Sequence, residues 1–483
     1  MNRAYITTSI PYVNGEPHVG FALELVQADA IARYQRSIGK KTRFQTGTDE
    51  NAFKNVLSAK KLGVGTQELV DRNSEVFRTL GEALNCAVDD FVRTTEERHR
   101  LGVHRLWEQL RPGDVYRKSY EGLYCTGCED FLLERDLVEG RCPDHETEPA
   151  PVEEENWFFR LSAYQEQIEE LIRSGRLGIA PEKRRREVLS FVERGLQDIS
   201  VSRRAERVAN WGVAVPGDEG QIIYVWIDAL INYLSGPGFG ESEPDESVGW
   251  REWWNEATHK VHVIGKNVWK FHAVYWPALL LSAGLPLPDE IVVHGFLTTN
   301  GRKIGKSLGN AVDPFESIER LGSDGVRYYL LRSVSPFDDG DFSSERLLNA
   351  YNGELANGLG NLVSRLTALA ERGGYGSFTA EPIPDPPDGF EKALARHEFD
   401  RSLDYLWEVI GQVNREVEIE RPWELLTEGN QEALNRLLDR WLTELHRIVY
   451  WLQPFLPEAA ERVLKGLERD PIRAFGSLFP RIR

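Results

Sequence analysis

The sequence predicts an α/β protein, in which a doubly wound parallel sheet is interrupted by an insertion and followed by an all-α bundle. Strand and helix signals alternate over residues 1–114 and again over 221–310, as they do in the βα units of a parallel sheet. Short strand signals and a cysteine cluster fill residues 115–220, and long amphipathic segments occupy 345–483. The 483 residues leave room for about two to four domains.

The first half of the predicted sheet begins with a strand over residues 3–9, which are rich in β-branched and aromatic side chains. A loop that contains Pro, Asn and Gly leads into a helix over 20–39, which Gly39 can cap. A second strand is expected over 42–46, and helices are expected near 51–61 and 66–85.

The insertion is expected to contain helices near 162–175 and 182–195. The sheet signals then resume with IIYVWIDALINYL, with VHVIGK ahead of a helix over 268–283, and with IVVHG. Residues 311–344 are expected to link the sheet to the bundle. The bundle itself is expected to have helices near 345–372, 391–419 and 431–453, with the Pro-rich stretch 381–389 as a loop.

Composition excludes several classes of protein. Charged residues make up 28% and apolar residues 41% of the chain, which is the balance of a soluble globular protein. The sequence contains no apolar run of about 18 residues, so a membrane span is not expected. The first residues lack the apolar core and the cleavage pattern of a secretory signal. We therefore expect a cytoplasmic protein.

The net charge of −18 argues against a nucleic-acid partner in general, because phosphate affinity comes mostly from Lys and Arg. Local basic patches can nevertheless hold RNA on an acidic protein. The first of the two densest cationic stretches is equally well explained as a solvated helix face. These stretches contain Lys183, Arg184, Arg185 and Arg186, and then Arg203, Arg204 and Arg207.

The cysteine spacing predicts a metal site. Cys125 and Cys128 form a CxxC knuckle, and thirteen residues separate it from a CxxH formed by Cys142 and His145. Three thiolates and one imidazole complete a tetrahedral zinc site without an open position, which is typical of structural zinc. The alternative is that these cysteines pack as small apolar residues. Cys86 stands alone and is expected to be buried.

Two short motifs resemble signatures of the class I aminoacyl-tRNA synthetases. HVGF, which starts at His18, is similar to HIGH, and KIGKS, which starts at Lys303, is similar to KMSKS. HVGF follows the first strand and opens a helix, and KIGKS follows the resumed sheet. Within the class, the methionyl-tRNA synthetase family with a single zinc knuckle is the closest match.

This resemblance implies a division of the chain into five parts. Residues 1–114 and 221–310 would form the two halves of a Rossmann-type catalytic domain, the second of which carries the KMSKS-like loop. Residues 115–220 would be the connective insertion with the zinc knuckle, and 311–344 a stem-contact linker. Residues 345–483 would form the α-helical anticodon-binding domain.

The resemblance also implies a reaction. The family activates L-methionine with ATP and Mg²⁺ to methionyl-adenylate, releases pyrophosphate, and transfers the methionyl group to the 3′ end of tRNA(Met). A histidine at a helix N-terminus, such as His18, can stabilise charge on the α-phosphate. Lys303 and Lys306 lie in a glycine-flanked loop suited to a triphosphate, and Lys306 would neutralise the pyrophosphate. These three residues are the expected catalytic groups, although KIGKS taken alone could be a basic surface turn.

In this family, several residues near these motifs contact ATP. Glu24 and Asn267 match positions near the ribose and the adenine. The full set expected at ATP is His18, Gly20, Phe21, Glu24, Asn267, Lys303, Lys306 and Ser307.

In the family, methionine binds through its ammonium and its thioether. Asp49, in TGTDE, matches the aspartate that meets the ammonium, and a carboxylate is the natural partner of a buried ammonium. Aromatic rings suit the polarizable sulfur, although Trp226 and Tyr233 could equally be core residues of a buried helix. The expected methionine-binding residues are Ile10, Tyr12, Asp49, Trp226, Ala229, Tyr233, Val268 and His272.

The family reads the methionine anticodon on its helical domain. Asn361, Arg365 and Trp423 match the residues that do so, and an exposed Trp can stack on an unstacked base. Trp423 could instead be a hydrophobic anchor at the start of a helix.

The chain also departs from the family pattern. Phe21 replaces the second histidine of HIGH, Gly305 removes a hydroxyl from KMSKS, and Asn51 and Asn267 stand where histidine and aspartate are common. One alternative is therefore a paralogue that binds tRNA or a nucleotide without aminoacylating. A synthetase for another amino acid is a second alternative. The valine, isoleucine and leucine enzymes need an editing insertion for which there is no room, and the cysteine enzyme uses its zinc to hold substrate. Since little chain follows the bundle, we expect a monomer.

Overall fold

The computed structural model describes residues 2–482 except 126–129, 133, 135–136, 144–145, 242–248, 300, 305–311 and 381. By its internal contacts the chain divides into two compact units. Unit 1 contains residues 1–17, 39–79 and 88–293, and unit 2 contains 18–38, 80–87 and 294–483. Among the described helices, none combines the length and the apolar character needed to cross a membrane.

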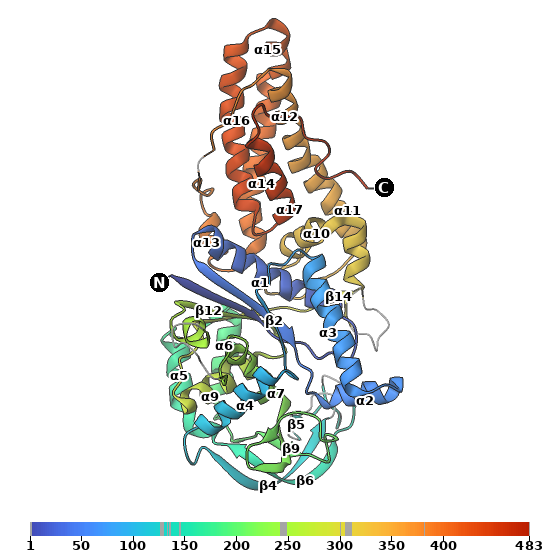
Figure 1. The fold of residues 1–483 in the computed structure, drawn as a ribbon, viewed down its shortest axis with the longest axis vertical. Helices are drawn as coiled ribbons and strands as arrows, with labels where there is room; N and C mark the ends of the chain where they lie inside the picture. The colour runs from blue at the N-terminus through green and yellow to red at the C-terminus, as the bar shows by residue number, and fades with distance from the viewer. Residues whose placement is uncertain are drawn as a thin grey trace. The chain divides into compact units, whose positions relative to one another are not determined.

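Unit 1 is built on a six-stranded sheet in the order β3-β2-β1-β12-β13-β7, of which Figure 1 labels β2 and β12. Strand β1 pairs in parallel with β2 on one side and with β12 on the other, and β2 pairs in parallel with β3. The strands are β1 (Arg3–Thr8), β2 (Lys41–Thr48), β3 (Asp90–Arg93), β12 (His259–Gly265), β13 (Glu290–His294) and β7 (Gly178–Ala180).

Burial explains why these segments form a parallel sheet. All six residues of β1 are buried, as are the last five of β2, because helices cover both faces of a parallel sheet. The core includes the fully buried rings of Trp254 and Trp276.

The helices described in unit 1 are α2 (Phe53–Leu62), α3 (Thr66–Ala83), α4 (Glu97–Gln109), α5 (Gln165–Arg173), α6 (Glu182–Glu193), α7 (Val225–Leu230), α8 (Asn232–Ser235), η3 (Arg251–Asn255), η4 (Phe271–Tyr275) and α9 (Trp276–Ala283), with η2 (Leu161–Tyr164) before α5.

The inserted segment forms small antiparallel sheets of its own, as its short strand signals predict. One sheet has the order β5-β4-β6-β8 and another the order β10-β11-β9. Another strand of the insertion, β7, extends the main sheet beside β13. The sequence did not predict this strand, because its three residues carry no periodic pattern. The strands are β4 (Val115–Cys125), β5 (Asp130–Leu132), β6 (Ala150–Phe159), β8 (Ile199–Ser200), β9 (Ser202–Arg204), β10 (Ala214–Val215) and β11 (Asp218–Ile223).

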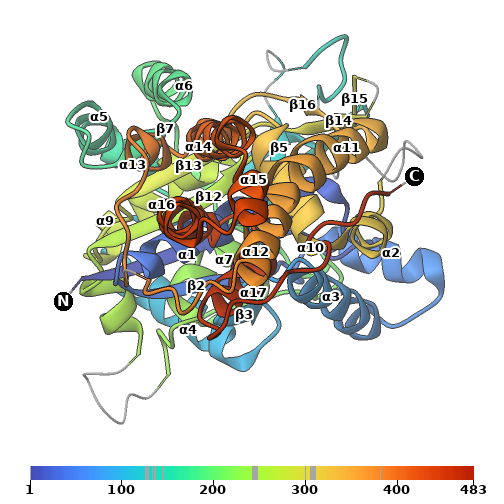
Figure 2. The same cartoon turned by 90° about the horizontal axis from the view of Figure 1, so that it is seen from above.

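Unit 2 is mainly helical, and Figure 2 looks along its long helices α14 and α16, which pack against each other and against α12. Helix α1 (Val19–Ser37) belongs to this unit and packs on α10. The other helices are α10 (Pro314–Arg332), α11 (Ser344–Ala350), η6 (Tyr351–Gly360), α12 (Asn361–Arg372), α13 (Phe390–Leu394), α14 (Phe399–Glu420), α15 (Pro422–Glu428), α16 (Gln431–Leu452) and α17 (Pro457–Leu467).

A parallel α/β sheet with an inserted segment and a helical C-terminal part is therefore confirmed. The five-part division of the chain stays a prediction. The segment 311–344, expected to be a linker, contains the 19-residue helix α10. Helix α1, which follows the first strand directly, is grouped by its contacts with the C-terminal part of the chain.

Candidate functional site

The carboxyl ends of β1, β2 and β12 lie at one edge of the sheet in unit 1, because these strands run parallel. Strand β2 lies on one side of β1 and β12 on the other, so the strand order reverses at β1. Ligands of doubly wound proteins bind outside the carboxyl ends of the strands at such a reversal. Ile10 and Tyr12 follow β1, Asp49 follows β2, and Val268 follows β12.

Asp49 and Tyr12 extend the pairing of β2 and β1 beyond the regular strands. The two residues form a parallel bridge, and the Asp49 amide donates to the Pro11 carbonyl at 2.8 Å. The Asp49 side chain is buried, whereas Ile10 and Tyr12 are half-buried. The structure therefore holds the expected ammonium-binding carboxylate next to an aromatic ring, at the edge where a ligand would bind.

Three aromatic rings form a continuous row at this edge. The Trp226 ring meets the Tyr12 ring edge-on, with 5.5 Å between centroids, and stacks on Phe271 with 4.2 Å between centroids and 8° between planes. Phe271 was missed by the sequence analysis, although it lies in the aromatic stretch that contains His272. Lys54, also missed, places its ammonium 4.6 Å from the Tyr12 ring centroid.

Tyr233 and His272 form a buried pair. The His272 Nδ1 atom lies 2.9 Å from the Val268 carbonyl oxygen, which only accepts, so Nδ1 carries the ring hydrogen. Nε2 then accepts from the Tyr233 hydroxyl at 2.7 Å. Burial lowers the pKa of His272 to about 4, against a smaller opposite effect of the Val268 hydrogen bond. His272 is therefore neutral at pH 7. Ala229, on α7, is also buried.

Helix α7, which carries Trp226 and Ala229, is tied to the end of β2 by side chains that the sequence analysis did not assign. Asn51 Nδ2 donates to Asp228 Oδ2 at 2.7 Å and to the Thr94 carbonyl at 3.0 Å. His99 Nε2 lies 3.2 Å from Asp228 Oδ1. Asn51, which departs from the family pattern, thus still supplies a hydrogen-bond donor. The signal that could have indicated Asp228 is its place inside the VWIDALINY stretch.

In unit 2, His18 is the N-cap of helix α1. Its Nδ1 atom accepts from the Gly20 amide at 3.1 Å, so a neutral ring carries its hydrogen on Nε2 and can donate there. A Cβ at position 20 would lie 2.8 Å from the His18 Cε1 atom. Only glycine therefore leaves room for the capping ring, and this explains the third residue of HVGF.

The other residues expected at ATP are placed as follows. Glu24 is buried on α1, and its Oε2 atom lies 2.8 Å from Nε2 of His294. Phe21 is almost fully buried, and its phenyl ring has no donor to replace that of the second histidine. Asn267 is exposed in unit 1.

The chain around KIGKS is anchored on both sides within unit 2. Before it, β14 (Leu297–Thr299) pairs with β15 (Arg302–Lys303), and Asp341 of β16 (Gly340–Asp341) accepts from the Gly301 amide at 2.9 Å. After it, the Val312 carbonyl accepts from the Val19 amide at 3.3 Å, next to His18. The backbone of Lys303 is thus placed, whereas Lys306 and Ser307 lie outside the described residues.

Half of the predicted zinc site can be described. Cys125, at the end of β4, and Cys142 are both buried. Cys142 lies in a tight turn, in which its amide donates to the Thr147 carbonyl at 2.9 Å and its carbonyl accepts from the Glu146 amide at 2.8 Å. Cys128 and His145 lie outside the described residues. A buried thiol at the end of a strand and a second in a tight turn fit a metal knuckle.

The residues expected at the anticodon lie on packed helices of unit 2. Asn361 and Arg365 are four residues apart on α12, which puts them on one face. Trp423 is on α15, which packs against α12. Its side chain is 39% exposed, which disfavours the alternative of a buried anchor. Arg365 is paired with Glu418 at 2.8 Å.

The cationic stretches of the insertion are largely paired with neighbouring carboxylates. Arg184 pairs with Glu187 and Arg185 with Glu182 on α6, which fits a solvated helix face. Arg203 is buried, and its guanidinium stacks 4.0 Å from the Tyr224 ring centroid.

Comparisons with known proteins point to one family. The profile described as "tRNA synthetases class I (M)" matches residues 4–151 and 145–367. The methionine–tRNA ligase of Thermotoga maritima is 39% identical over 96% of this chain and 75% of its own length. That of Brucella suis is 39% identical over 96% of this chain and 91% of its own. The solved Mycobacterium tuberculosis methionyl-tRNA synthetase in complex with methionyl-adenylate is 36% identical, covers 100% of both chains, and gives a TM-score of 0.90.

The neutral state of His272 predicts a pH-dependent stability. An unfolded imidazole takes up its proton near pH ~6.5, whereas His272 in the folded protein does so near pH 4. The unfolded state therefore binds more protons in this window, and His272 lowers the free energy of unfolding as the pH falls through it, by about 3 kcal/mol in total. Urea unfolding of His272→Asn at several pH values should show a flatter dependence than the wild type. Part of the pH dependence of the unfolding free energy should remain in this variant, because burial also lowers the pKa of His262. An unchanged slope would contradict this assignment.

Proposed function

This chain belongs to the methionyl-tRNA synthetases of class I, and we propose that the residues described above act in that family's reaction. The chain activates L-methionine with ATP to methionyl-adenylate, releases pyrophosphate, and transfers the methionyl group to tRNA(Met). The single observation that supports the residue roles best is the grouping of Asp49, the aromatic row and the Tyr233–His272 pair at one sheet edge of unit 1.

Methionine recognition is proposed to use two kinds of contact. The buried carboxylate of Asp49 receives the ammonium, since a carboxylate compensates a desolvated cation. Tyr12 and Trp226 receive the thioether side chain, because sulfur packs favourably near ring edges. Ile10, Ala229 and Val268 supply apolar surface. A neutral His272 adds no positive charge that would repel the ammonium.

Adenylate formation is proposed to depend on His18 and the KIGKS loop. The substrate carboxylate is itself the nucleophile, so the enzyme supplies position and charge stabilisation. The Nε2 hydrogen of His18 donates to the α-phosphate, and Gly20 keeps that ring in place. Lys303 and Lys306 neutralise the pyrophosphate, which Mg²⁺ accompanies as part of the nucleotide substrate. Phe21, Glu24, Asn267 and Ser307 complete the proposed ATP contacts.

A structural zinc ion is proposed for Cys125, Cys128, Cys142 and His145. The burial of both thiols and the tight turn at Cys142 support this assignment. Four protein ligands would leave no open position, so the metal holds the insertion together and takes no part in the reaction.

The helical part of unit 2 is proposed to bind the anticodon through Asn361, Arg365 and Trp423. The exposure of the Trp423 ring and the packing of α15 on α12 support this role. A cytoplasmic location is proposed, since charging of tRNA serves translation.

Methionine-dependent exchange of pyrophosphate into ATP tests the proposed function. We expect exchange with L-methionine, and we expect Asp49→Asn to raise the KM for methionine by about a hundredfold, because a buried charged partner is removed. Glu68→Gln, an exposed carboxylate on α3, is the matched control and should behave like the wild type. Exchange that depends on a different amino acid would show that the enzyme is specific for that amino acid. Exchange with no amino acid would favour the paralogue that binds tRNA or a nucleotide without aminoacylating.

Loss of the Trp423 ring should affect tRNA and not activation. Since stacking on one base contributes about 1–3 kcal/mol, Trp423→Ala should slow charging of tRNA(Met) by roughly tenfold or more at limiting tRNA, with exchange intact. Leu62→Ala, which removes an exposed apolar side chain of unit 1, serves as control. Equal losses in charging and exchange would place Trp423 in a structural role.

Metal analysis of the purified protein should find about one zinc ion per chain. Cys125→Ser should lower both the zinc content and the melting temperature, because a structural site contributes folding energy. Cys86→Ala, outside the cluster, should retain the zinc. Zinc loss with an unchanged melting temperature would refute a structural role.

A further inference from the structure

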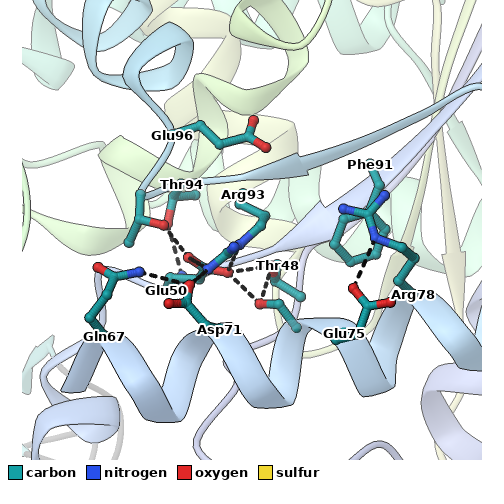
Figure 3. A network of polar contacts seen from close by, with 12 residues as sticks. Thr48, Glu50, Gln67, Asp71, Glu75, Arg78, Phe91, Arg93, Thr94 and Glu96 are labelled. Carbon is teal, nitrogen blue, oxygen red and sulfur yellow. Dashed lines mark hydrogen bonds and ion pairs between the residues drawn. The ribbon is translucent and has the colours of Figure 1, made fainter. Parts of the chain in front are cut away.

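The carboxylate of Glu50, next in sequence to Asp49, is the centre of a buried polar network at the end of β2 (Figure 3). Its side chain has no exposed surface. The Arg93 guanidinium donates to it twice, from Nε at 2.6 Å and from Nη2 at 3.1 Å. Hydroxyl groups supply the remaining donors, which come from Thr48, Ser74 and Thr95. The Glu50 network thus satisfies this carboxylate fully inside the protein.

Arg93 connects the network to α3. Its Nη2 atom also donates to Asp71, whose side chain is 49% exposed. A guanidinium stays charged at any working pH. The positive charge of Arg93 is therefore balanced mainly by the buried Glu50, because solvent screens the charge of the half-exposed Asp71.

The sheet register places the backbone of Arg93 beside the residue that precedes Asp49. Arg93 is paired with Thr48, the residue that directly precedes Asp49, and neighbouring strands lie about 4.8 Å apart. Consecutive side chains of an extended chain point to opposite faces. Thr48, Glu50 and Arg93 accordingly share one face, where they are hydrogen bonded, and Asp49 leaves the chain on the other.

We propose that Glu50 is a positioning residue for methionine recognition, because it pairs with Arg93 and so leaves the negative charge of Asp49 available to the substrate ammonium. This inference rests on the proposed role of Asp49. Without Glu50, the positive charge of Arg93 would be balanced only by the half-exposed Asp71, and the excess positive charge beside the segment that carries Asp49 would oppose binding of the positive substrate. Glu50 also fixes the backbone from which Asp49 projects, since the Glu50 amide donates to Thr94 Oγ1 at 2.8 Å.

The test compares Glu50→Gln, Arg93→Gln and the double variant in methionine-dependent pyrophosphate exchange. Glu50→Gln should raise the KM for methionine by roughly tenfold or more, because the charge of Arg93 is then unbalanced at the buried end of β2, and should leave the KM for ATP within about twofold. Adding Arg93→Gln to it removes the unpaired cation and should restore most of the methionine KM. A double variant as weak as Glu50→Gln, or weaker, would overturn the proposal, because a purely structural contact is not rescued by a second deletion.

A ligand without the ammonium supplies a second readout. The Ki of 4-(methylsulfanyl)butanoate, which is methionine without its amino group, should be unchanged or lower in Glu50→Gln, because its only charge is a carboxylate. Equal weakening of both ligands would overturn the proposal. If Glu50→Gln does not fold, Arg93→Gln alone carries the test: it removes the cation and keeps the Glu50 carboxylate, so the methionine KM should stay unchanged or fall, and a raised methionine KM would overturn the proposal.

Failure of the inference can be told apart from failure of the proposed function. Absence of methionine-dependent exchange in the wild type, or full activity of Asp49→Asn, would reject the role of Asp49 itself. If those two results are as expected and only the rescue by Arg93→Gln is missing, the role of Glu50 alone is rejected.

Discussion

Parallel pairing of β1 with β2 on one side and β12 on the other is the constraint on which unit 1 depends. It brings the carboxyl ends of three strands to one edge, so that residues from distant parts of the sequence meet there. A buried polar network keeps the helices in register with this sheet. The Tyr5 hydroxyl donates to Gln45 at 2.6 Å, and Gln45 donates to the Asn232 carbonyl at 3.0 Å. Since Asn232 precedes Tyr233, the sheet itself fixes the position of the buried tyrosine.

A different interaction organises unit 2. Asp29 of α1 and Arg327 of α10 form an ion pair at 2.7 Å with both side chains fully buried. Arg327 also donates to the carbonyls of Pro454 and Phe455 at the end of α16. A buried pair of this kind resists the removal of either partner, since one uncompensated charge costs about 3–5 kcal/mol. The helix that His18 caps is thereby fixed to the C-terminal helices, which explains why its contacts group it with them.

In both units, the partners of a buried carboxylate determine whether it is available to a ligand. In unit 1, neighbouring carboxylates have separate tasks, because Glu50 is saturated by donors of the protein and Asp49 projects to the opposite face. In unit 2, the Glu24 carboxylate is hydrogen bonded to His294. A ribose bound to Glu24 would therefore share this carboxylate with His294. Such second partners are as important for the site as the residues that touch substrate, because they decide the orientation and the charge that a ligand meets.

The sequence by itself determined the features that depend on contiguous residues. The alternation of strands and helices, the HVGF and KIGKS motifs and the cysteine spacing all lie within short stretches, where periodicity and side-chain chemistry can be read directly. Asp49, Trp226 and His272 could be named because their motifs are local. Only the tertiary structure decided that Arg93 pairs with Glu50, that α1 belongs with α10, and that β7 joins the main sheet. These contacts form between charged groups and backbone groups that are far apart in the sequence. The spacing of residues along the chain does not show which distant groups meet in space.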